Sequence, residues 1–302
     1  GSLKPTSNGK RHRLPKTTAT LIDIIERSLV PKAPGIPTED AIVVTPCFCA
    51  VIDGATSKDH TSAYGPETPG QVAARLLSAS VRSLPPDSSA EEAVCHLTQA
   101  IAGYCRARFG ETAALRHPSI RPTASVALFS LHRKAVWLFG DCQCRFGGHT
   151  YTNNKLIDSI LAQVRSDILC HLLEQGRSKS ERERIKSQLQ RSDLGRKFIA
   201  DALHDQQAFQ NGTPDNPYSY AVIDGTPFPL SAIRTFHVDS GEVILASDGY
   251  PVLCDSLHET EEKLHELNQR DPLCIRENKQ TKGILPQANS YDDRSYLRFS
   301  IR

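Results

Sequence analysis

The chain has 302 residues, of which 39% are hydrophobic and 23% are charged, and its formal net charge is +2. This composition is typical of a folded globular protein and excludes a disordered chain, and the small net charge favours neither an acidic nor a basic partner. No apolar run approaches the length of a membrane span, and the N-terminus lacks the apolar centre of a signal peptide. We therefore expect a cytoplasmic protein that has no membrane partner.

The first 19 residues form a basic leader. They combine proline, serine and threonine with a cluster of lysines and arginines: Lys4, Lys10, Arg11, Arg13 and Lys16. No aromatic residue interleaves this cluster to stack on bases, so we expect a flexible solvated tail and no nucleic-acid partner. Residues 20–302 are expected to form one domain.

Short apolar runs and turn residues define the first elements. Residues 20–29 have helical spacing, and the prolines and glycine of 31–38 exclude regular structure there. A strand pair is predicted over 41–52, interrupted at Thr45-Pro46 and ended by Asp53-Gly54. A loop is predicted over 55–70.

Two helices and a hairpin are predicted next. The helices cover residues 71–83 and a second segment whose start is marked by Ser89 and Glu92, the spacing of a capping box. Strands at 125–131 and 135–139 are separated by a polar turn, and the second strand ends at Gly140-Asp141.

The middle of the chain is predicted to be helical and charged. Residues 156–210 have helical spacing, and the alternating charges of 177–197 indicate a solvated face. A linker follows at 211–217, where asparagine, glycine and proline gather.

Strands dominate the C-terminal part. They are predicted at 220–223, 232–238, 243–246 and 296–301, with one charged helix at 257–267. Asp224-Gly225 is interpreted as a turn. Hairpins and short connections favour antiparallel pairing, so the expected fold is an α+β, four-layer α-β-β-α sandwich, in which helices flank two largely antiparallel sheets.

The nine cysteines are an odd number and lie mostly in apolar segments, which favours buried thiols over a disulfide framework. Cys47 with Cys49 and Cys142 with Cys144 are spaced to share a strand face, and two such pairs are also compatible with a zinc site. We favour packing, because the usual zinc signature leaves two residues between ligands.

Acidic residues stand at the edges of apolar strands in well-separated parts of the chain. The set is Glu39, Asp40, Asp53, Asp141, Asp248 and Asp292. Each alone is explained as a turn or strand-end residue. Together they indicate an oxygen-only site for Mg²⁺ or Mn²⁺, because carboxylates gather in a partly buried place only around positive charge.

The order of these motifs resembles that of the metal-dependent serine/threonine protein phosphatases of type 2C, the PPM family. Within that family, the chain looks like a divergent bacterial-like member. The resemblance runs from Glu39-Asp40 through Asp53-Gly54, Gly140-Asp141 and Leu245-Ala-Ser-Asp248-Gly249 to Asp292-Asp293. It implies a hydrolase that cleaves phosphoserine and phosphothreonine esters of proteins by attack of a metal-activated water, without a phosphoenzyme.

The resemblance also implies roles for single residues. Asp53 would bridge two Mg²⁺ or Mn²⁺ ions and orient the attacking water, with the carbonyl of Gly54 on one ion. Asp248 and Asp292 would hold one ion, and Glu39 or Asp40 the other. A third ion would use Asp141 and Asp248, but the position of its remaining ligand is Val252.

Two further departures concern catalysis. Ala55 stands where eukaryotic members have a histidine, and Gly35 stands where an arginine commonly anchors phosphate. Lys32, Arg27 and Lys58 are candidate replacements for that arginine.

Two alternatives stay open. The first is a catalytically weak or inactive scaffold that binds a partner through residues 156–210, and the second is a metal hydrolase of small phosphate esters. For the main hypothesis we expect a monomer whose partner is a phosphorylated protein substrate.

Overall fold

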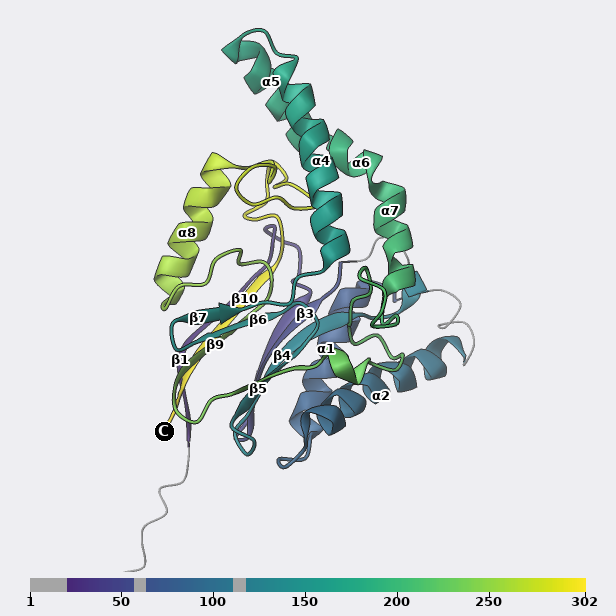
Figure 1. Cartoon of the computed structure of the whole chain (residues 1–302), viewed down its shortest axis with the longest axis vertical. Helices are drawn as coiled ribbons and strands as arrows, with labels where there is room; N and C mark the ends of the chain where they lie inside the picture. The colour runs from purple at the N-terminus through teal and green to yellow at the C-terminus, as the bar shows by residue number, and fades with distance from the viewer. Residues whose placement is uncertain (1–20, 57–63, 111–117) are drawn as a thin grey trace, which may run out of the picture.

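The computed structural model describes residues 21–56, 64–110 and 118–302 (Figure 1), so the basic leader and Lys58 lie outside the described residues. Two five-stranded sheets form its centre, and every pairing between their strands is antiparallel. In spatial order, the first sheet contains β1 (Ile22–Val30), β10 (Arg294–Ile301), β9 (Gly241–Ala246), β6 (Gln143–Phe146) and β7 (His149–Tyr151). The second contains β2 (Asp40–Val44), β3 (Phe48–Gly54), β4 (Ala124–Ser130), β5 (Ala135–Phe139) and β8 (Arg234–His237).

The two sheets pack face to face through apolar side chains. Phe129 of β4 and Phe299 of β10 meet in this layer with ring centroids 5.1 Å apart. Because side chains alternate along a strand, Val243 and Leu245 of β9 point into the layer, whereas Ile244 packs on the opposite face.

Helices cover both outer faces, which confirms the expected α-β-β-α sandwich. On the second sheet, α1 (Pro69–Ser83) and α2 (Ala90–Phe109) bury a large apolar cluster (Figure 1). On the first sheet, α8 (Leu257–Arg270) packs Leu264 against the outer face.

Capping boxes start both helices of the first group. Ser89 accepts a hydrogen bond from the backbone of Glu92 at the start of α2, as its spacing predicts, and Thr68 and Gln71 do the same for α1. The start of α1 lies against the end of β3 so closely that a Cβ on Gly54 would come within 2.4 Å of the carbonyl oxygen of Gly70. Only glycine at position 54 permits this approach.

A helical arm extends beyond the sheets in Figure 1. It comprises α4 (Leu156–Glu174), α5 (Lys179–Arg191), α6 (Leu194–Phe198), α7 (Ala200–Asp205) and a short 3₁₀ turn (Gln206–Phe209). In α5 only Leu189 is buried, so its charges form a solvated face as predicted.

Arg165 of α4 is fully buried and ties the arm to the loop after α8. Its guanidinium pairs with Asp193 at 2.7 Å and donates to the carbonyls of Leu273, Cys274 and Gln280. This contact fixes residues 271–283 beside the arm.

Two predictions about local structure are wrong, and one hairpin was missed. Residues 22–30 form strand β1 where a helix was expected, because pairing with β10 along the whole segment outweighs its helical spacing. Residues 220–223 make only isolated bridges and no strand. The hairpin of β6 and β7, which turns at Gly147 and Gly148 with positive φ, was not predicted at all.

The nine cysteines are all free thiols, as expected. Cys49, Cys142 and Cys144 pack in the apolar layer between the sheets. In the described residues, no helix combines the length and the hydropathy that crossing a membrane requires.

Candidate active site

Carboxylates from both sheets gather at one end of the sandwich. Asp40 of β2 lies directly opposite Asp53 of β3, and Asp141 follows β5 on the same sheet. Asp248 follows β9, and Asp292 precedes β10, on the other sheet. Because these strand ends share one edge of the sandwich, side chains up to 252 positions apart in the sequence become neighbours.

A cavity of about 440 Å³ opens at this place. Four of the predicted carboxylates line it, Asp53, Asp141, Asp248 and Asp292, together with Gly54. The structure therefore brings together most of the acidic residues that the sequence singled out.

Burial and mutual repulsion raise the pKa values of the carboxylates that have no lysine partner among the described residues. Burial, followed by the neighbouring carboxylates Asp40 and Asp248, raises the pKa of Asp53 well above its usual value. Burial raises the pKa of Asp40 to about 8, although Ser295 donates a hydrogen bond to it at 2.7 Å. Burial, with repulsion from Asp141 and Asp292, raises the pKa of Asp248 to about 7. Without added positive charge, this part of the site binds protons at neutral pH.

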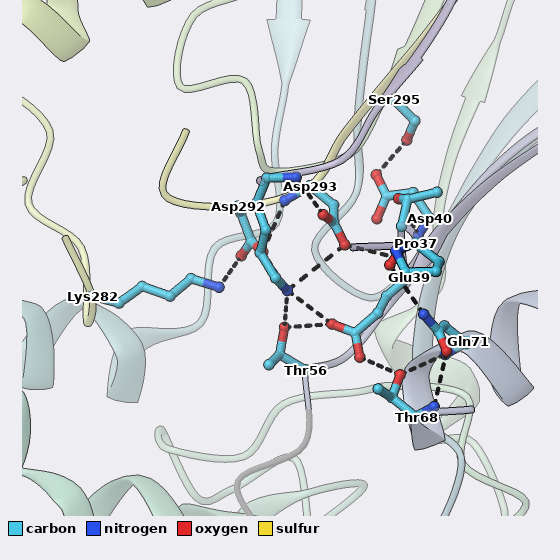
Figure 2. A network of polar contacts seen from close by, with 12 residues as sticks. Pro37, Glu39, Asp40, Thr56, Thr68, Gln71, Lys282, Asp292, Asp293 and Ser295 are labelled. Carbon is cyan, nitrogen blue, oxygen red and sulfur yellow. Dashed lines mark hydrogen bonds and ion pairs between the residues drawn. The ribbon is translucent and has the colours of Figure 1, made fainter. Parts of the chain in front are cut away.

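Lysines neutralise the other carboxylates. Lys155 lies 2.6 Å from Asp141. Lys282 lies 2.6 Å from Asp292, the pair that Figure 2 shows. Burial alone would raise the pKa of Asp141 and of Asp292, but the ammonium groups outweigh it and hold both pKa values below their usual range. Lys32 lies 3.0 Å from Glu39 and 3.8 Å from Asp292.

Glu39 and Asp40 are buried next to the site. In Figure 2, Glu39 accepts from Thr68 at 2.6 Å and from Thr56 at 2.8 Å. Together with Lys32, these donors satisfy both of its oxygens. Neither Glu39 nor Asp40 is among the residues that line the cavity.

The donor chemistry of the site fits a hard divalent cation, since its donors are carboxylate oxygens and they outnumber the lysines that pair with them. The side-chain positions, however, are those of a lysine-paired cluster. Among the described residues, no group of three histidine, cysteine or acidic side chains is placed to hold a metal ion. A cation that bound here would compete with Lys155 and Lys282 for Asp141 and Asp292.

Two of the three candidate phosphate anchors, Arg27 and Lys32, are not among the residues that line the cavity. Arg27 donates to the carbonyl of Ile42 at 3.2 Å and joins β1 to β2. Lys32 is held by hydrogen bonds to Glu39 and Thr56, and Lys58 lies outside the described residues.

Sequence reasoning missed the cations that do line the cavity. They are Arg121, Lys155, Arg196, Lys279 and Lys282. They come from loops and helix ends without a common motif, so only the tertiary structure reveals that they share a wall.

Asp224 was interpreted as a simple turn residue, and its role is larger. It is completely buried and accepts hydrogen bonds from Gln210, Asn211 and Thr226 in addition to an ion pair with Arg121 at 3.1 Å. Only the contact with Thr226, two residues away, is local. The dipeptide Asp-Gly gives no sign of the rest of the network, because Gln210 and Asn211 are 14 and 13 residues away in the sequence and Arg121 is about 100 residues away.

No protein-family model and no curated protein sequence matches this chain. Solved structures do match over most of its length. The serine/threonine phosphatase PstP/Ppp of Mycobacterium tuberculosis is 14% identical, with a TM-score of 0.45 over 93% of this chain and 98% of its own. PppA of Pseudomonas aeruginosa is 15% identical, with a TM-score of 0.45 over 94% and 100%. The serine/threonine phosphatase Stp1 of Staphylococcus aureus is 12% identical, with a TM-score of 0.43 over 98% and 100%. At this distance, the similarity establishes neither a family nor an activity for this chain.

Proposed function

We propose that this protein is a hydrolase of phosphomonoesters that depends on Mg²⁺ or Mn²⁺ and acts on phosphoserine and phosphothreonine in proteins. One observation carries the proposal: Asp53, Asp141, Asp248 and Asp292 come from four separate strand ends and line one cavity together with five basic side chains. Such a cavity suits both a divalent cation and a phosphoryl dianion, since it offers hard oxygen ligands and positive charge side by side.

The roles of the residues follow from their charge partners. Among the described residues, no lysine is paired with Asp53 or with Asp248, so a cation would meet these two carboxylates first. A divalent cation held by these carboxylates would supply Lewis-acid chemistry, the polarisation of a water molecule and of a phosphoryl oxygen. The carboxylate of Asp53 orients the attacking water by accepting its hydrogen bond, and Asp141 and Asp292 complete the acidic wall.

The finer parts of the proposal come from the motif resemblance. The first of these parts is the number of ions. There would be two, one held by Asp248 and Asp292 and the other by Glu39 or Asp40. A phosphoprotein substrate, a monomer and a cytoplasmic location belong to the same proposal.

The deciding experiment compares hydrolysis of p-nitrophenyl phosphate and of a phosphothreonine peptide with Mn²⁺ and with EDTA. We expect turnover of both substrates that requires Mn²⁺ and is lost in Asp53→Asn. Asp201→Asn, on the exposed face of α7, is the matched control and should keep full activity.

The same experiment separates the alternatives. A folded protein that hydrolyses neither substrate at any Mn²⁺ concentration would be a scaffold. Turnover of the aryl phosphate alone would indicate a hydrolase of small esters.

A further inference from the structure

Arg196 of α6 is a cation without a carboxylate partner in the wall of the cavity. Within the described part of the chain, its guanidinium makes one hydrogen bond, from Nη1 to the carbonyl of Thr281 at 2.8 Å, and no ion pair. The three arginines that are buried in the described ranges differ from it, since each pairs with a carboxylate: Arg121 with Asp224, Arg165 with Asp193 and Arg294 with Glu261.

The surroundings of Arg196 direct it toward the acidic site. Its contact with Thr281 places it next to the segment that carries Lys282, whose ammonium lies 2.6 Å from Asp292. Both side chains line the same cavity as Asp53 and Asp248. Arg196 is half-buried, and burial lowers its pKa because its charge is partly removed from water.

A second observation points to a ligand at this wall. Asn278 is buried and lines the cavity, and its Nδ2 makes no hydrogen bond of good geometry among the described residues, since its contact with the Tyr291 hydroxyl falls short of that geometry. An unpaired buried donor is costly, so it indicates a place for an oxygen-rich group. A partly desolvated guanidinium that lines the same cavity favours an anion with planar or tetrahedral oxygens.

We propose, on the basis of the function proposed above, that Arg196 and Lys282 anchor the phosphoryl group of the substrate and that Asn278 donates to one of its oxygens. This anchor comes from the helical arm and the loop after α8. It takes over the task of the arginine that the sequence lacks at Gly35. The guanidinium fork binds two phosphoryl oxygens, and Lys282 adds a second positive charge.

The test measures binding of inorganic phosphate by titration calorimetry, with Mn²⁺ and with EDTA, so that it does not depend on catalysis. We expect Arg196→Gln to weaken phosphate binding at least about tenfold, the effect of one charge-assisted hydrogen bond. KM for p-nitrophenyl phosphate should rise by a similar factor, more than kcat falls. Arg184→Gln, an exposed arginine on α5, should change neither quantity.

Two further variants separate anchoring from a structural role. Arg196→Lys keeps the charge but not the fork, and should bind phosphate several-fold more weakly than the wild type. Added guanidinium at millimolar concentration should restore phosphate binding to Arg196→Ala, which a merely displaced loop would not allow. If Arg196→Gln does not fold, Arg196→Lys decides.

Each outcome bears on one proposal or the other. Wild-type phosphate affinity in Arg196→Gln or in Arg196→Lys would overturn the anchor and leave the hydrolase standing. Binding that depends on Arg196 in a protein without turnover would keep the anion site and overturn the hydrolase. A wild type that binds no phosphate under either condition would overturn the anchor.

Discussion

Lys155 sets the charge state of Asp141 at the edge of the cavity. Its ammonium lies 2.6 Å from that carboxylate, and Ser125 donates a hydrogen bond to the other oxygen. Lys155→Gln would leave Asp141 without its counter-ion among other carboxylates. We expect a loss of about 1–3 kcal/mol in the free energy of unfolding in EDTA at pH 8.

The loss should be smaller at pH 5. In the variant, Asp141 can take up a proton at that pH, since the ammonium that lowers its pKa is gone. Urea unfolding at both pH values measures the effect, and Lys179→Gln on exposed α5 is the control. An equal loss at pH 5 and pH 8 would contradict this account of Lys155.

The thiols give a second test at the level of single residues. Burial raises the pKa of Cys49 and of Cys144 to about 12, whereas Cys95 is exposed. Because the thiolate is the reactive form, we expect Cys95 to react with a disulfide reagent in the native protein. Cys49 and Cys144 should react only after unfolding. Mass spectrometry of the labelled peptides identifies the sites, and fast native labelling of Cys144 would show that the layer between the sheets opens readily.

At the level of elements, Thr68 joins a helix start to the acidic site. Its hydroxyl caps α1 and donates to Glu39 at 2.6 Å, whereas Ser89 only caps α2. Ser89→Ala should therefore cost about 1 kcal/mol of stability. Thr68→Ala should cost about 2 kcal/mol, because it also removes a hydrogen bond to a buried carboxylate. Chemical denaturation measures both losses, and Thr68→Ser is the control that keeps the hydroxyl. Equal losses in the two alanine variants would mean that the hydrogen bond to Glu39 contributes nothing to stability.

Elements with local signals were predictable from the sequence, and those that depend on tertiary contacts were not. The capping box at Ser89 and the strand that ends at Asp53-Gly54 are local, and both stand where they were predicted. Strand β1 has a helical pattern and becomes a strand only because β10 pairs with it. In the site, the acids were found because they follow or precede apolar strands, whereas Lys155 and Lys282 carry no such mark.

At the level of the whole molecule, the two sheets bring carboxylates together against their mutual repulsion. Asp40 and Asp53 belong to one sheet, and Asp248 and Asp292 flank strands of the other. Folding therefore concentrates negative charge, which protons, lysines or divalent cations must neutralise. Lysines neutralise Asp141 and Asp292. The remaining carboxylates need protons or a metal ion instead, so they make the stability of the fold sensitive to pH and to metal.

The sign of this pH dependence follows from the raised pKa values. In the unfolded chain Asp40 and Asp248 titrate near 3.8, and in the folded chain at about 8 and about 7. Between these values the folded state binds more protons than the unfolded state. Without a divalent cation, the stability contributed by these two groups is therefore complete below about pH 4 and is lost as the pH rises to about 8. Asp141 and Asp292 have lowered pKa values, so their contribution to stability changes only at pH values below this range.

A divalent cation should reverse that loss, because it replaces the protons as the source of positive charge. We expect Mn²⁺ to raise the midpoint of thermal unfolding more at pH 8 than at pH 5. At a concentration of 100 times the dissociation constant, the gain should reach about 2.7 kcal/mol. NaCl at matched ionic strength controls for screening, and Asp53→Asn should reduce the Mn²⁺ effect at pH 8. A cation effect that is equal at both pH values, or stability in EDTA that rises from pH 5 to pH 8, would mean that the gathered carboxylates do not govern the stability of this fold.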